Sequence, residues 1–368
     1  MKYVVSAPSR AAEDSTAERA KRRLSDALRA VAGGRGDRIY GSTRRWYRVA
    51  TRGWKTALNS QLDLRRYLRH SFVLTDPVST DHMASFLRMR YHTFEKGLSL
   101  PEPRPGFGQV ELEALLRVLD HYERRVGCDE LFQTVVNVLT EYQAYNATHG
   151  VVLEDLDELL ADYRARYPEL DGSETGGTMW LTRDEIAKAT DFDFEAFVST
   201  RHSVRNYLLD PVSHDQIERA VRVAQRSPSV CNRQAGRAHV FTEPARVQEI
   251  LSYQGGHRGF GHTVPCVIVI TADLGSYYKP GERFQGWVDG GLFTMSLIFG
   301  LHAEGLGSCC LNWNVTREED EPMRAAAGIP DNEVVITMLA VGHLPEQLRV
   351  AQSPRRPVED VLIYGDPT

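Results

Sequence analysis

Two arginines, a histidine and a serine lie within five residues in the segment RHSVR, at 201–205. A guanidinium group presents its N–H donors as a planar fork that matches the oxygens of a phosphate. A second basic segment, PRRP at 354–357, places Arg355 and Arg356 near the end of the sequence. These residue types indicate that an anionic group such as a phosphate is bound. The alternative is an ordinary solvated basic cluster.

The segment SPSVCNRQ, at 227–234, adds two amide side chains. Asn232 and Gln234 are two positions apart, so their amides point the same way if the backbone is extended. An amide both donates and accepts hydrogen bonds, which suits the edge of a planar heterocycle. The alternative is a plain turn that is capped by serine and asparagine side chains.

A third segment, GLGSCCLN at 305–312, follows a long apolar stretch. Gly305 and Gly307 allow the backbone to turn tightly and to approach a ligand closely. These glycines end an expected helix and do not open one, so the segment is not a dinucleotide-binding fingerprint.

The elements that position these segments are expected to be helices separated by strands, which indicates a mixed α and β layer fold. Ser213 and Gln216 form a capping box that predicts a helix over 213–227. Apolar, β-branched runs predict strands over 238–242, 264–271 and 334–341. A longer helix over 284–302 is apolar nearly all round, which is typical of burial in a core or an interface. One face of that helix carries Phe284, Trp287, Gly291, Met295, Ile298 and His302.

The first half of the chain is predicted to be mostly helical. Between about 54 and 167, apolar residues recur at helical spacing, as in Met83, Phe86, Leu87, Tyr91 and Phe94. The small polar segment DGSETGGT, at 171–178, is typical of a linker or a mobile loop. We therefore expect a mostly helical N-terminal domain over 1–180 and a second domain over 190–368.

Charge is distributed unevenly along the 368 residues. The net charge is −5, yet residues 1–60 carry +9 and the rest of the chain carries −14. A basic arm of this kind suggests an anionic partner, a membrane surface or self-association, and the simpler interpretation is a solvated helical face. Because the chain as a whole is not basic, we do not expect a nucleic-acid binder.

Apolar runs and cysteines favour a cytoplasmic protein with reduced thiols. The longest apolar run, at 264–270, is far shorter than the roughly 18 residues that a membrane-spanning helix needs. The five cysteines are odd in number and form no CxxC pair, so neither a disulfide framework nor a zinc ribbon is expected. We expect no metal, because His92 and Glu95 share a helix face without a further set of ligands.

In this order and spacing, the segments resemble motifs of the FMN-dependent nitroreductase family. RHSVR resembles its Arg-x-Ser-x-Arg motif, and SPSVCNRQ resembles its Ser-Pro-Ser-x-x-Asn-x-Gln motif. DGGLFTMSLIFGLHAEGLGSC resembles its long interface helix with the glycine turn, and PRRPVEDVL resembles its terminal Arg-x-Pro-hydrophobic-Glu segment. The resemblance covers about 194–364, somewhat under half the chain. It implies an α+β fold in which helices wrap a mainly antiparallel sheet, and it implies a homodimer.

The resemblance also implies roles for particular residues. Six residues would hold the FMN phosphate and ribityl oxygens, the last of them as a helper: Arg201, His202, Ser203, Arg205, Arg355 and Arg356. Asn232 would hydrogen-bond the pyrimidine edge of the flavin, and Gln234 would lie near that edge or the ribityl chain. Pro228 and Ser229 would come from the other protomer, because family sites form across the dimer interface.

Two departures from the family leave the substrate open. The backbone of Leu311 and Asn312 would lie near the flavin N5, where many members carry Gly-Gly or Glu-Gly and this chain reads NWN. Trp313 would then stack on the flavin or close over the substrate. After the Asn-x-Gln pair the family often continues Pro-Trp, whereas Ala235 and Gly236 remove bulk here.

The implied function is an FMN-dependent oxidoreductase that uses NAD(P)H to reduce a small electron-poor acceptor by ping-pong hydride transfer. The flavin carries the chemistry, so no side chain is assigned as catalytic. If a proton donor is used, the candidates are Tyr207, Tyr253, His257 and His262, each with an ordinary packing role as the alternative. Two other functions stay open. One is a flavin-dependent dehydrogenase or oxidase acting on a biosynthetic intermediate, and the other is a non-catalytic scaffold that keeps the fold.

Two further features have competing interpretations. The segment HTFEKGLSLPEPRPGFG, at 92–108, resembles a leader in nitroreductase-like proteins associated with surface-polysaccharide biosynthesis. The alternative is a helix C-terminus at which Lys96 meets the dipole, Gly97 caps the helix and Pro101 ends it. Cys231 is either a redox thiol beside the flavin or, more simply, a structural cysteine.

Overall fold

A computed structural model describes residues 47, 49–170, 172 and 175–365 of the chain. The chain divides into two compact units, Met1–Asp63 and Leu64–Thr368. Within the first unit, the described residues from 49 onward are helical. Most of the basic arm lies outside the described residues, so its anionic or membrane partner stays a prediction.

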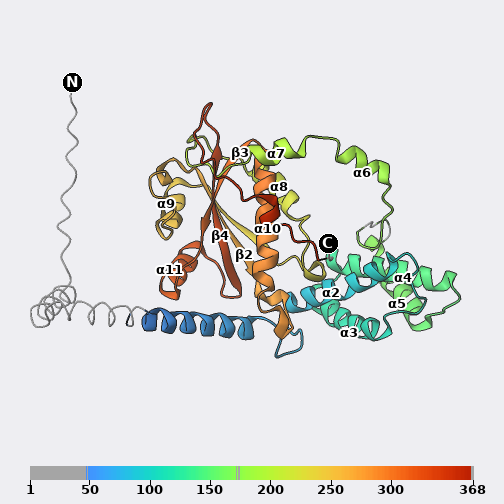
Figure 1. Cartoon of the computed structure of the whole chain (residues 1–368). Helices are drawn as coiled ribbons and strands as arrows, with labels where there is room; N and C mark the ends of the chain where they lie inside the picture. Colours follow the sequence, from blue (N-terminus) through green and yellow to red (C-terminus); the bar gives the residue numbers. More distant parts are fainter. Residues whose placement is uncertain (1–46, 48, 171, 173–174, 366–368) are drawn as a thin grey trace, which may run out of the picture. The chain divides into compact units, whose positions relative to one another are not determined.

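Four helices in the second unit form a bundle with one apolar core (Figure 1): α2 (Thr80–Leu98), α3 (Gln109–Val126), α4 (Glu130–Thr148) and α5 (Glu154–Arg166). The Ser79 side chain accepts a hydrogen bond from the His82 N–H at the start of α2, and Asp129 caps α4 in the same way. The residues predicted from helical spacing on α2 are all buried, so this helix and its inner face are confirmed: Met83, Phe86, Leu87, Tyr91 and Phe94.

The 92–108 segment is a packing element between α2 and α4. The alternative of a helix C-terminus is confirmed, because α2 ends at Leu98 with Lys96 in its last turn, but Gly97 lies inside the helix and Ser99 is the C-cap. A Cβ atom at Gly97 would collide with the ring of Phe107, which packs 5.1 Å from the ring of Tyr142 between centroids. The Gly106 N–H donates to the buried Asn146 side chain at 2.6 Å. The resemblance of this segment to polysaccharide-associated proteins stays a prediction.

The second unit also contains a four-stranded antiparallel sheet with the strand order β1-β2-β4-β3. The strands are β1 (Gly236–Phe241), β2 (Cys266–Asp273), β3 (Leu306–Asn312) and β4 (Glu333–His343). β2 is buried along its whole length, as its apolar run predicted. Helices with an antiparallel sheet confirm the α+β class.

The strand β3 was not predicted, because 305–312 was interpreted as a turn. The turn is confined to Gly305, whose φ is 73°. From Leu306 to Asn312 the chain pairs with β4, and a Cβ atom at Gly307 would collide with Val204 and Leu344. Small and polar residues such as those in GSCC have weak strand propensity, so the pairing with β4 decides the conformation.

Helices cover both faces of the sheet. α8 (His214–Ala224) begins with the predicted Ser213–Gln216 capping box and packs along α10 (Gln285–Ala303). Gly300 makes this packing possible, because a Cβ atom there would collide with the backbone of Ala220. α9 (Pro244–Ser252) packs on β2, and α11 (Arg317–Ala327) packs on α9. Figure 1 shows α10 running beside the sheet.

α10 is only half buried. Its inner side chains, such as Phe293 and Leu297, enter the core. The predicted face is divided: Ile298 is buried, whereas Phe284, Trp287 and Met295 are exposed. Burial of this face in the core is therefore excluded within one copy of the chain. Burial in an interface remains the expectation.

The remaining elements are short. α6 (Arg183–Ala189) and α7 (Phe194–Thr200) precede the sheet region. Six 3₁₀ turns are also found among the described residues: η1 (Pro168–Leu170), η2 (Val230–Asn232), η3 (Gly261–Thr263), η4 (Leu274–Ser276), η5 (Pro280–Glu282) and η6 (Val358–Asp360). All five cysteines are free thiols. In the described part of the chain, no helix is long and apolar enough to span a membrane, and no group of side chains could hold a metal.

Candidate functional site

The RHSVR segment lies against the edge strand β3. Arg201 is the C-cap of α7, and the chain then extends beside the sheet. Ser203 forms a parallel bridge with Ser308, and the Val204 N–H donates to the Ser308 carbonyl at 2.9 Å. Val204 is buried and Arg205 is exposed. The sheet edge therefore fixes the backbone while the basic side chains remain accessible.

The C-terminal segment closes a cavity over these residues. The cavity has a volume of about 190 Å³ and is lined by Arg201, His202, Ser203, Arg205, Ala351, Gln352, Ser353 and Arg355. Within the described ranges, none of its three arginines has a carboxylate partner. Arg205 donates to the Ser203 carbonyl at 3.4 Å, and Arg355 donates to the Ser353 carbonyl at 2.8 Å. Most of their N–H donors remain available for an anion.

The structure does not bring Arg356 to this cavity. Its Nε atom lies 3.5 Å from a carboxylate oxygen of Asp360, four residues further along the chain. The predicted helper role of Arg356 has no geometric support here.

The SPSVCNRQ segment lines a different cavity, of about 380 Å³. Ser227, Pro228, Ser229 and Gln234 line it together with residues of α2, α8, α10 and β1. This cavity shares no lining residue with the arginine cavity. Within one copy of the chain, therefore, the structure does not bring Pro228 and Ser229 to the arginines. This separation agrees with their expected role in the site of another protomer.

The backbone of this turn is left-handed at three residues. The φ angles are 48° at Cys231, 52° at Asn232 and 54° at Gln234, so the backbone is not extended, and the alternative of a turn is the one that the structure shows. The two amides nevertheless meet, because Gln234 Nε2 donates to Asn232 Oδ1 at 3.3 Å. Left-handed non-glycine residues are unfavourable and persist only where the surroundings impose them. Contacts with the rest of the fold must therefore hold the turn.

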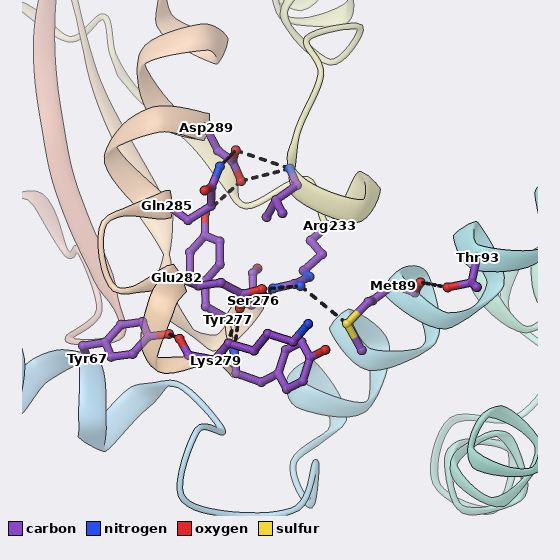
Figure 2. A network of polar contacts seen from close by, with 12 residues as sticks. Tyr67, Met89, Thr93, Arg233, Ser276, Tyr277, Lys279, Glu282, Gln285 and Asp289 are labelled. Atoms are coloured by element: carbon purple, nitrogen blue, oxygen red, sulfur yellow. Dashed lines mark hydrogen bonds and ion pairs between the residues drawn. The ribbon is translucent and has the colours of Figure 1, made fainter. Parts of the chain in front are cut away.

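A buried arginine holds the turn to the rest of the fold (Figure 2). Arg233 is 2% exposed and forms a bidentate ion pair with Glu282, with N–O distances of 2.8 and 2.9 Å. It also donates to the Ser276 carbonyl at 2.9 Å and to Met89 Sδ of α2 at 3.4 Å. Burial acts to raise the pKa of Glu282, but the Arg233 guanidinium and backbone N–H donors hold that pKa below its usual value.

A buried carboxylate fixes the other side of the turn. Asp289 of α10 is 3% exposed and accepts a hydrogen bond from the Val230 N–H at 3.3 Å. It also accepts hydrogen bonds from Tyr277 at 3.1 Å and Gln285 at 2.8 Å. Sequence reasoning missed both Arg233 and Asp289. The available signal was Asp289 itself, which is a lone charged residue in an otherwise apolar helix.

The end of β3 has its polar groups engaged within the fold. Leu311 is buried, and the Asn312 carbonyl accepts a hydrogen bond from Gln254 Nε2 at 2.7 Å. The Trp313 indole N–H donates to Asp320 at 2.9 Å, and the ring packs against the core under α9 and α11. Stacking of Trp313 on a flavin would need this packing to change.

The candidate proton donors differ in accessibility. The Tyr207 hydroxyl lies 2.7 Å from the Val204 carbonyl and 3.1 Å from the Ala340 carbonyl. Burial raises the pKa of Tyr207 far above its usual value, which makes proton release unfavourable. His257 Nδ1 is buried and has no hydrogen-bond partner among the described residues. Cys231 is an exposed free thiol, and its redox role stays a hypothesis.

Comparison with known proteins agrees with the motifs. Residues 198–254 and 243–343 match the model of the nitroreductase family. A protein of Archaeoglobus fulgidus, named as a candidate NADH dehydrogenase/NAD(P)H nitroreductase, is 28% identical over 150 residues, which cover 40% of this chain and 82% of that protein. The 4-nitrobenzoate reductase of Pseudomonas putida is 31% identical over 121 residues, which cover 32% of this chain and 46% of that protein.

Among solved structures, the FMN-dependent nitroreductase of Clostridium difficile R20291 aligns with a TM-score of 0.39 and 18% identity. The alignment covers 46% of this chain and 98% of that chain. The family match confirms the resemblance for residues 198–343 and does not extend into the helical bundle.

Proposed function

We propose that this chain, which matches the nitroreductase family over residues 198–343, is an FMN-binding oxidoreductase that takes electrons from NAD(P)H. The observation that carries the proposal is the arginine cavity. Three arginines from two distant segments line it, and none of them has a carboxylate partner in the part of the chain that is described. Like charges that converge repel one another, so the convergence of three arginines indicates an anionic ligand.

The donor set suits the phosphate of FMN. Arg201, Arg205 and Arg355 offer planar forks, and the Ser203 hydroxyl adds a short donor. When bound, FMN supplies reversible two-electron transfer, which would serve NAD(P)H and a small electron-poor acceptor in turn. The residues of this chain would bind the cofactor, orient it and exclude water from it.

The exposed side of α10 supports a homodimer. Trp287, Val288, Leu292 and Met295 are 38–53% exposed along this helix. Contiguous apolar side chains on a surface mark interaction sites. A second copy is the expected occupant, because SPSVCNRQ lies apart from the arginine cavity within one copy.

Replacing Leu292 with aspartate is expected to convert the dimer into monomers, because the new carboxylate would be buried without a partner. We expect the dimer dissociation constant to rise by roughly 100-fold or more, measured by size-exclusion chromatography with light scattering. Val110→Asp is the matched control, since Val110 is 75% exposed on α3, away from the expected interface. A dimer of unchanged stability in Leu292→Asp would contradict the assigned interface.

The test of the proposed function is an absorption spectrum of the purified full chain, before and after anaerobic NADH and then NADPH. A yellow protein that bleaches with one nucleotide supports the proposal and identifies the donor. A yellow protein that neither nucleotide bleaches would favour a dehydrogenase or oxidase acting on another substrate. A colourless protein that takes up no added FMN would refute the proposal and favour a scaffold.

A further inference from the structure

The helical bundle contributes one side chain to the cavity beside the SPSVCNRQ turn. Of the residues that line this cavity of about 380 Å³, only Arg88 comes from the bundle, and it comes from α2. Ser229, Gln234 and Phe293 are among its other lining residues. The nitroreductase family match begins at residue 198, so Arg88 lies outside the part of the chain that the match covers.

The position of Arg88 is fixed by its neighbours on α2. Leu87 and Met89 are buried on either side of it, with 0% and 5% exposure. Met89 Sδ also accepts a hydrogen bond from Arg233, whose ion pair anchors the turn. The contact visible in Figure 2 therefore joins α2 to the turn whose residues also line the cavity. The backbone from which the Arg88 side chain extends is therefore held in place by its buried neighbours.

The other charges of the cavity are already engaged. Arg237 lies 3.8 Å from Asp273 and donates to the Gln234 carbonyl at 2.7 Å. Asp289 accepts hydrogen bonds from three donors of the fold. Arg88 is half-buried, and the described residues provide it with neither a hydrogen bond nor an ion pair. It is the lining cation whose donors are available for a ligand.

The walls indicate what else the ligand contains. Ala224, Ala235 and Phe293 are buried and give the cavity an apolar side. A volume of this size holds a small molecule and is at the lower end of ligand pockets. A cation facing an apolar wall suits a planar molecule that carries a carboxylate or a phosphate.

We propose that Arg88 of the helical bundle binds the anionic group of the reacting small molecule where this cavity, in the expected homodimer, completes the flavin site of a second copy, and that Arg88 thereby selects anionic over neutral substrates. The inference rests on the proposed function for the identity of the reaction, and on the geometry alone for the binding of the anion. The anionic group has two sources, a carboxylate of the acceptor or a phosphate of the nicotinamide dinucleotide. Arg88 is a specificity residue and takes no part in electron transfer.

The kinetic test compares Arg88→Gln with the unmodified full chain on matched acceptors. For 4-nitrobenzoate, kcat/KM is expected to fall roughly 10- to 100-fold, as for the loss of a charge-assisted hydrogen bond. For neutral 4-nitrobenzamide the change should stay below about twofold. If Arg88 instead binds the dinucleotide, KM for NADH or NADPH rises and both acceptors are unaffected. Equal losses for both acceptors, or no loss in any substrate, would overturn the proposal.

A binding measurement separates this inference from the proposed function. Benzoate and benzamide are titrated into the same proteins and followed by ligand-observed NMR, with FMN content recorded independently by absorption. Preferential benzoate binding that Arg88→Gln abolishes supports the anion site even if the protein takes up no flavin. Lys96→Gln, which removes an exposed charge from the same helix, is the matched control and should leave the preference unchanged. If Lys96→Gln lost the preference for benzoate over benzamide to the same extent, the effect of Arg88 would come from its net charge and not from its place in the cavity.

Discussion

Replacing Arg233 with methionine is expected to lower the free energy of unfolding by about 3–5 kcal/mol. Methionine preserves much of the volume but removes the partner of Glu282, whose carboxylate then lies in the fold without its ion pair. It also leaves the Ser276 carbonyl without its donor. A buried charge without a partner is among the few causes of losses this large. The midpoint temperature of thermal unfolding should fall by about 5–15 °C.

The double variant Arg233→Met/Glu282→Met shows whether the loss comes from the orphaned carboxylate. Replacing both members of a buried pair by apolar residues is often neutral, so most of the lost stability should return. Equilibrium unfolding of both variants in urea, followed by fluorescence and circular dichroism, measures the difference. A double variant as unstable as Arg233→Met would show that the hydrogen bonds to Ser276 and Met89 matter more than the ion pair.

The same comparison tests how the left-handed turn is maintained. Cys231, Asn232 and Gln234 have positive φ angles without being glycine, and Arg233 sits among them. If the Arg233 contacts impose these angles, Arg233→Met should loosen the cavity wall at Ser229 and Gln234 before the sheet unfolds. Faster amide hydrogen exchange confined to 227–236, at a denaturant concentration where β2 is still protected, is the expected signature.

Features that local sequence encodes were predicted well. The Ser213–Gln216 capping box is formed as expected, because its geometry depends on residues three positions apart. The inner face of α2 follows from 3.6-residue periodicity, and β2 follows from a continuous β-branched run. The convergence of the RHSVR and PRRP segments was not encoded locally. It was expected only from the family resemblance, and the structure brings Arg355 to Arg201 and Arg205.

Features that depend on distant partners were missed. β3 forms because β4 supplies its hydrogen bonds, although its own residues favour strand weakly. For Asn232 and Gln234, an extended backbone and a capped turn were both left open, because the sequence alone does not decide between them. The conformation of this turn depends on Arg233 reaching Glu282, 49 positions further on, and on Asp289 reaching Val230. The interpretation of Gly97 as a helix cap missed its packing role. That role depends on Phe107, which lies in the next loop and whose ring leaves no room for a Cβ atom at residue 97.

Removing two arginines of the small cavity is expected to have the largest effect on the cofactor. We expect Arg355→Gln to raise the dissociation constant for FMN by roughly 10- to 100-fold, because it removes a charged donor to the phosphate. The double variant Arg201→Gln/Arg355→Gln should raise it by roughly 100- to 1,000-fold, somewhat less than additively, since both residues face one ligand. Fluorescence quenching of FMN on titration of apoprotein measures the constants.

Riboflavin makes this prediction specific, because it has the flavin ring and ribityl chain of FMN but lacks the phosphate. The unmodified protein should bind FMN far more tightly than riboflavin, and the two variants should lose that difference while their riboflavin binding stays nearly constant. Arg356→Gln is the neighbouring control, because Arg356 pairs with Asp360 and does not line the cavity. If the variants weakened the binding of FMN and of riboflavin by the same factor, the FMN phosphate would not be bound by these arginines. A large effect of Arg356→Gln would mean that the C-terminal segment rearranges when the cofactor binds, so that the ion pair with Asp360 is exchanged for one with the phosphate.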